Sequence, residues 1–204
     1  QVTIQVHDVD FNALVAQVNP ASGYALPATF GNLGSRLVAE GAIDPRRWLQ
    51  VYQAAGQPLT DQQVALLTKD SNTAIVINPS DAYFLLNFFW AVGLTNKNPI
   101  LTHMLTVQGL AGVSGLASTG GWSIGKKEGM GLYGSAALIT LTPEQQTHLE
   151  AVALHIFRPC CDNPTTFPDC NHGMAMLGLL ELMASQGATE DEMFSAAKYI
   201  NAFW

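Results

Sequence analysis

The sequence predicts a mainly α fold, with one compact helical domain over residues 1–204, a few short β-strands and a glycine-rich irregular segment. The 204 residues are 48% hydrophobic and only 12% charged, which supplies a sizeable apolar core and argues against disorder. Five helix starts also carry a capping or proline signal. They are Asp44-Pro45, Thr60 with Gln63, Ser80, Thr142-Pro143 with Gln145, and Thr189 with Glu192.

The N-terminal segment combines strand and helix patterns. Residues 1–7 place apolar side chains at every second position, which is typical of a short strand with one buried face. Residues 11–18 have the spacing of a short amphipathic helix. We expect a loop over residues 27–31, and then a helical stripe over residues 33–38 that stops at Gly41.

Two helix starts follow in close succession. Asp44 can cap a helix whose first position is Pro45, so we expect a helix that ends near Gly56. Thr60 and a glutamine three residues later form a capping-box pattern, which predicts a second helix through Leu67.

The most apolar helix is expected after a short strand. Residues 74–77 are rich in β-branched side chains and predict that strand. Ser80 can cap the helix that follows, over residues 83–90, which is apolar nearly all round. A helix without a polar face is predicted to be buried, so we expect it at the centre of the fold.

The middle of the chain is rich in glycine. Residues 109–134 contain nine glycines, too many for a regular helix, so we expect loops or irregular strands there. Residues 120–126 match the first part of a phosphate-binding loop, but Lys127 stands where Ser or Thr would bind magnesium. No apolar strand leads into the match. We therefore predict no nucleotide site and interpret the segment as a surface loop into which Trp122 is tucked.

Residues 143–204 are predicted to form a C-terminal helical subregion that carries all three cysteines in one loop. Proline and capping signals predict three helices in this part of the chain. Their expected limits are Thr142 to Phe157, Asp169 or Asn171 to Gly187, and Thr189 to Trp204.

Composition excludes some classes of partner. With a formal charge of −7 and nine Lys and Arg residues, the chain lacks the basic surface that nucleic acid or an anionic membrane requires. No apolar run approaches the roughly 20 residues of a transmembrane helix. The sequence does not begin with methionine and has few lysines. These features fit an exported, periplasmic or extracellular, protein, although a trimmed chain accounts equally well for its first residue.

The strongest functional signal is the loop between the first two helices of the C-terminal subregion. Cys160, Cys161, Cys170 and His172 follow the pattern Cys-Cys-x8-Cys-x-His. Thiolates and imidazole are ligands for copper and zinc, and thiolates also hold iron–sulfur clusters. The nearby Pro159 and Pro164 can help the backbone turn sharply enough for adjacent cysteines to share an ion. We therefore predict a metal or metal-cofactor site, with copper or zinc as the first expectation.

Two further residues are candidate ligands. His155 lies one turn before the loop, although an ordinary hydrogen-bonded helix histidine explains it as well. Met176 lies four residues after His172 and shares its helix face, although core packing also accounts for a methionine there. Noncovalent haem, with His172 and a methionine as axial ligands, is a further interpretation; covalent attachment is not supported because there is no Cys-x-x-Cys-His.

Two alternatives use the same cysteines without a metal. Cys170 stands near a predicted helix N-terminus, where the dipole favours a thiolate, so Cys160 or Cys161 could act as its resolving partner in a thiol–disulfide oxidoreductase. A redox or assembly protein would then be the partner. The other alternative is a helical interaction domain with a structural disulfide, which leaves the third cysteine unexplained.

A limited family resemblance covers the last third of the chain. Its matching parts are Arg158-Pro159-Cys160-Cys161, Ala175 to Ala184, Gly187, and Thr189-Glu190-Asp191-Glu192-Met193. In these parts, residues 143–204 resemble the thiol-bearing three-helix domain of bacterial cytochrome c maturation thiol-reductases, and exported PCYCGC-motif proteins. The resemblance implies an exported helical architecture. The chain departs from the pattern with Cys-Cys in place of Cys-x-x-Cys and with the added Cys170-Asn171-His172, so it supports the architecture better than reductase activity.

Overall fold

The computed structural model describes residues 10–204, so the strand predicted over residues 1–7 lies outside the described part of the chain. Helices make up 57% of the structure, which confirms the mainly α class. The elements are α1 Phe11–Val18, β1 Tyr24–Gly31, α2 Leu33–Ala39, α3 Pro45–Ala54, α4 Asp61–Leu66, β2 Ser71–Ile77, α5 Ala82–Thr95, α6 Pro99–Gly115, α7 Ala117–Gly120, α8 Gly129–Leu132, α9 Pro143–His155, α10 Asn171–Ser185 and α11 Glu190–Phe203.

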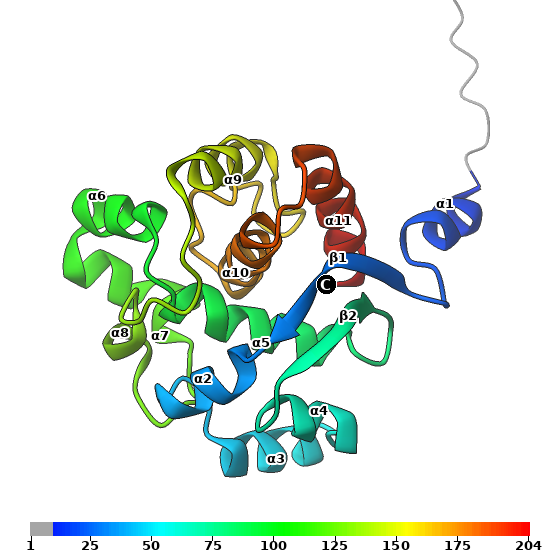
Figure 1. Ribbon diagram of the computed structural model, residues 1–204, viewed down its shortest axis with the longest axis horizontal. Helices are drawn as coiled ribbons and strands as arrows, with labels where there is room; N and C mark the ends of the chain where they lie inside the picture. The colour runs from blue at the N-terminus through cyan, green and yellow to red at the C-terminus, as the bar shows by residue number, and fades with distance from the viewer. Residues whose placement is uncertain (1–9) are drawn as a thin grey trace, which may run out of the picture.

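Helices α5 and α10 form the centre of the fold (Figure 1). They approach closely because each has a glycine at the crossing. A Cβ atom on Gly93 would lie 2.0 Å from the carbonyl oxygen of Met174, and one on Gly178 would lie 2.5 Å from that of Phe89. Backbone contact of this kind leaves no room for a larger side chain. The buried central helix expected near residues 83–90 is confirmed as α5.

The other elements cover this pair on several sides. Helices α9 and α11 pack on α10, while α2 packs against α5, and α3 and α4 lie beyond it at the bottom of Figure 1. The C-terminus is tied to the start of α5, since Trp204 Nε1 donates to the carbonyl oxygen of Ala82 at 3.1 Å. The C-terminal helices thus enclose α10, whose first turn carries part of the candidate site. No helix in the part of the chain that is described has the length and apolar character needed to cross a bilayer.

The prediction of a loop over residues 27–31 is wrong, because these residues belong to β1, which pairs antiparallel with β2. Leu26, Ala28 and Phe30 point into the core at every second position, which was a strand signal. Pro27 obscured it, since proline cannot donate to a ladder. The pairing register shifts between Ala25 and Thr29, so Pro27 falls on an irregularity that does not need its N–H. Strand β2 is also longer than the predicted residues 74–77.

Most predicted helix starts are confirmed. Asp44 caps α3, and capping boxes open α4, α9 and α11 at Thr60, Thr142 and Thr189. The Ser80 cap is wrong: α5 follows Asp81, and the Asn78 side chain accepts the backbone N–H groups of both residues at 2.8 and 3.0 Å.

The glycine-rich segment is more helical than predicted. Helix α6 continues to Gly115 across a kink at Gly109, whose φ of 69° is accessible to glycine. Short helices α7 and α8 follow. Trp122 is buried and donates to Ala42 O, while the N–H groups of Lys126 and Lys127 both donate to Gly41 O. Those two amides are therefore already bonded within the protein; the absence of nucleotide binding stays a prediction.

Candidate metal centre

Cys160 and Cys161 lie at the tip of a closed turn after α9. Phe157 and Pro164 form a β-bridge that closes the turn. Inside it, Arg158 donates its N–H to Asn163 O at 3.2 Å and accepts from Asp162 N at 2.9 Å. Asp162 adopts a φ of 54°, a left-handed conformation that aspartate tolerates better than most residues. This backbone presents both thiols to solvent.

Cys170 caps α10, so the predicted caps Asp169 and Asn171 are each wrong by one residue. The Sγ atom of Cys170 accepts the N–H of Gly173 at 3.4 Å, the role usually filled by a hydroxyl or carboxylate oxygen. Asp169 does not cap the helix because its carboxylate has other partners. Its Oδ1 accepts from Arg158 at 2.5 Å and its Oδ2 from Asn163 at 2.8 Å.

The four predicted ligands, together with Asp169, form two groups of three that share Cys170. Donor atoms of Cys160, Cys170 and His172 all lie within 4.8 Å of one another, and so do those of Cys161, Asp169 and Cys170. The Sγ atoms of Cys160 and Cys161 are 3.7 Å apart. Two thiolates bound tetrahedrally to one zinc ion at about 2.3 Å would be separated by about 3.8 Å. The sulfurs of Cys160 and Cys161 therefore already stand at ligand spacing, and the three thiols are free.

Arg158 lies beneath the cluster and fixes its shape. Its side chain is 1% exposed and donates to Pro164 O, Phe167 O and Asp169 Oδ1, all on the far side of the loop. Burial by itself lowers the pKa of Arg158, but the nearby sulfurs of Cys170 and Cys161, with Asp169, raise it overall. A permanent positive charge thus supports the loop from inside. The sequence contains no local signal for this role, and Arg158 stands out in it only through the resemblance of its segment to thiol-bearing domains.

The thiol of Cys160 is hard to ionise. Desolvation, helped by the neighbouring Cys161 and Cys170, raises the pKa of Cys160 to about 11. At neutral pH this residue is a thiol, which is a weak nucleophile but can still lose its proton to an incoming metal ion.

His172 is oriented by Trp204. Its Nε2 lies 3.2 Å from the carbonyl oxygen of Trp204, which can only accept a hydrogen bond. In the neutral imidazole that a metal requires, Nε2 therefore donates to this oxygen, and the lone pair is on Nδ1. Such a bond to the second ring nitrogen is the usual way in which a protein sets the tautomer of a metal-ligating histidine.

Comparison with protein-family models, curated proteins and solved structures gives no match to this chain. The function is therefore argued from the site itself, and the resemblance of residues 143–204 to thiol-reductase domains stays a prediction.

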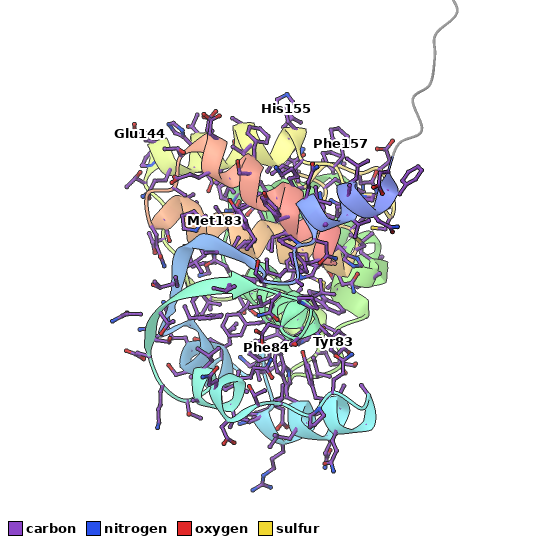
Figure 2. All side chains as sticks on the ribbon, turned by 90° about the vertical axis from the view of Figure 1, so that its right-hand side faces the viewer. Tyr83, Phe84, Glu144, His155, Phe157 and Met183 are labelled. Carbon is purple, nitrogen blue, oxygen red and sulfur yellow. The ribbon has the colours of Figure 1, made fainter. Side chains whose placement is uncertain are left out.

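His155 does not join the cluster, and Met176 is a core residue. The His155 ring Nδ1 is 2.8 Å from Ala151 O, and Figure 2 shows this side chain at the outer edge of the molecule. Within residues 10–204, His155 belongs to neither group of potential ligands. Met176 is fully buried in the hydrophobic core. Both positions match the alternative explanations, an ordinary helix histidine and core packing. Asp169 joins the cluster instead, although the sequence suggested it only as a possible helix start.

Proposed function

We propose that the protein binds one transition-metal ion through Cys160, Cys170 and His172. The observation that carries this proposal is that their donor atoms lie within 4.8 Å of one another. They come from two segments, the turn after α9 and the first turn of α10, that hydrogen bonds already hold together. Binding therefore requires proton loss and small side-chain movements rather than folding of the loop.

The donor set favours a thiophilic ion, copper(I) or zinc. Two thiolates and one imidazole suit both ions, whereas calcium and magnesium prefer oxygen. With copper(I), two thiolates leave one net negative charge, which the buried Arg158 beneath them would stabilise. With zinc, the three ligands leave one position of the usual tetrahedron open. A mixed set of three such ligands supports an iron–sulfur cluster less well, since those clusters are normally held by four protein ligands.

A metal titration tests the proposal directly. Reduced protein should bind one equivalent of copper(I) or zinc, measured by competition with a chromophoric chelator under anaerobic conditions. Cys170→Ser is a sharp variant because serine is a good helix cap, so α10 keeps its start while the site loses a sulfur. It should bind metal at least about 10-fold more weakly.

Histidine variants supply the controls. His172→Ala should weaken binding, whereas His148→Ala, which removes only an exposed contact with Glu190 at 3.0 Å, should bind like the parent protein. His155→Ala decides whether that residue contributes. If the reduced protein takes up neither ion, or if Cys170→Ser binds as tightly as the parent, the proposal is wrong.

Thiol–disulfide exchange is a second candidate function. It is favoured by the position of Cys170, whose Sγ lies within 4.8 Å of the Sγ atoms of both Cys160 and Cys161. A small loop movement would bring either pair to disulfide distance. The raised pKa of Cys160 disfavours that residue as the attacking thiolate. Mass spectrometry of the oxidised protein without reductant distinguishes the functions: a Cys170 disulfide that exchanges with dithiothreitol, without metal uptake after reduction, would favour exchange.

A further inference from the structure

We infer that the centre is a transfer site, in which Cys161 accepts the bound ion from Cys160 and His172 and passes it to a thiolate-bearing acceptor. This inference rests on the proposed function and goes beyond it, because it assigns a role to the one cysteine outside the proposed set of three ligands. It also identifies the partner by its chemistry, as a protein that offers soft ligands.

The first observation is that the two ligand groups overlap. Cys170 belongs to both, and Cys161 Sγ lies 3.7 Å from Cys160 Sγ. An ion bound to Cys160 and Cys170 is thus already near Cys161. It can move from one group to the other while Cys170 stays attached, so it is never released into solvent.

The second observation is the exposure of the site. Cys160 and Cys161 are both exposed at the tip of the turn, whereas Arg158 is buried behind them. An acceptor can approach the ion from the solvent side, where a three-coordinate ion has an open position. A structural metal site is usually closed by four protein ligands.

The third observation is that the loop does not depend on the ion for its shape. Arg158 bridges to Pro164, Phe167 and Asp169, and Asn163 adds a second bond to Asp169. These bonds join the turn to the start of α10 without a metal. The ion can therefore leave while its ligands stay in place for the next one.

The exchange balances without a change of oxidation state. Cys161 loses its proton to solvent as its sulfur binds the ion, and the bonds from the ion to His172 and then to Cys160 break. An acceptor thiolate binds in the vacated position, a second one displaces Cys161, and Cys170 is released last. Each cysteine that leaves the ion takes up a proton, and each acceptor thiol that binds releases one.

Transfer kinetics test the inference separately from binding. The protein is loaded with copper(I) or zinc, whichever binds more tightly, and mixed with increasing concentrations of an acceptor chelator, bathocuproine disulfonate for copper(I) or pyridylazoresorcinol for zinc. Direct transfer requires the rate to rise linearly with acceptor concentration. Cys161→Ser should keep the one-to-one metal load but lower the slope about 10-fold.

Asp162→Asn is the matched control, because it changes the neighbouring residue of the same turn, tolerates its φ of 54° and removes no sulfur. It should transfer metal like the parent protein. A rate independent of acceptor concentration, or an unchanged slope in Cys161→Ser, overturns the transfer inference and leaves metal binding intact. Failure of both ions to bind at one equivalent overturns both proposals.

Discussion

Arg158 and Gly173 are in such close contact that a Cβ atom on Gly173 would lie 2.6 Å from Cζ of the arginine. The guanidinium passes directly over the first turn of α10, next to the residue whose N–H is bonded to Cys170. Glycine generally stabilises a helix less than alanine does. Here it provides the space that lets one buried cation support both halves of the cysteine loop.

The first prediction is that Gly173→Ala will displace Arg158 and weaken metal binding. The added methyl group meets the guanidinium itself, which is fixed by three acceptors and cannot move without losing hydrogen bonds. We expect destabilisation of about 1–3 kcal/mol by chemical denaturation, together with weaker metal affinity. Gly115→Ala is the control, since nothing lies within 4 Å of its added atom. Equal stability of the two variants would contradict the contact.

The second prediction concerns Asp169. Asp169→Asn keeps the shape of the side chain but removes the negative charge that Arg158 contacts at 2.5 Å. Because Arg158 is buried, its charge loses the one ionic partner that it has within residues 10–204, and we expect a loss of about 1–3 kcal/mol in the free energy of unfolding. The exposed Asp61→Asn, in the first turn of α4, should change stability by less than about 1 kcal/mol. A stability loss no larger than that control would show that the carboxylate charge is unimportant.

Local signals predicted the helices of this fold well, because a cap needs only residues close in sequence. Thr60 and Gln63 bond to each other across three residues, and the sequence contains all the information for that start. The gathering of cysteines was predictable for the same reason. The predictions at Pro27 and Gly109 were wrong because both residues usually interrupt regular structure. Here Pro27 lies in a strand next to a register shift, and Gly109 lies in a helix at a kink.

The structural support of the site could not be predicted in this way. The hydrogen-bond acceptors of Arg158 lie six to eleven residues away in sequence, and the space for its side chain depends on Gly173 in α10. Asp169 looked like a helix cap because its spacing allows that role. Only the position of the buried guanidinium decides that its carboxylate turns away and that Cys170 caps α10.

The third prediction is that metal affinity will rise with pH. A thiol must lose its proton to bind an ion, and the pKa of Cys160 is raised to about 11 by desolvation and by its two neighbouring thiols. Below that pH, this residue alone should reduce the apparent affinity about 10-fold for each unit of acidification. Competition titrations between about pH 6 and 9 would show the slope, and Cys160→Ser should reduce it by about one proton. An affinity independent of pH would contradict ligation by Cys160.

The fourth prediction concerns a carboxyl group away from the metal centre. Glu181 lies in α10, fully buried, and neither of its oxygens has a hydrogen-bond partner within residues 10–204. Desolvation raises the pKa of Glu181 well above its usual range. The nearby amide side chains of Asn96 and Asn98 lower it only in part, because they do not reach hydrogen-bonding geometry with the carboxyl group. The folded protein therefore keeps Glu181 protonated at pH values at which the unfolded chain has ionised it.

This difference makes stability fall as pH rises. The contribution of Glu181 is fully present below about pH 4.3, where both states are protonated, and is lost progressively up to the folded pKa at about 1.4 kcal/mol per pH unit. Glu181→Gln cannot ionise and should lack this slope, so its free energy of unfolding should increase relative to the parent protein between about pH 5 and 8. Other titrating groups are common to both proteins and cancel in the difference. Glu144→Gln, at an exposed position in the first turn of α9, supplies the control. If the free energies of unfolding of Glu181→Gln and the parent protein differ by the same amount at every pH in this range, Glu181 is ionised in the folded protein.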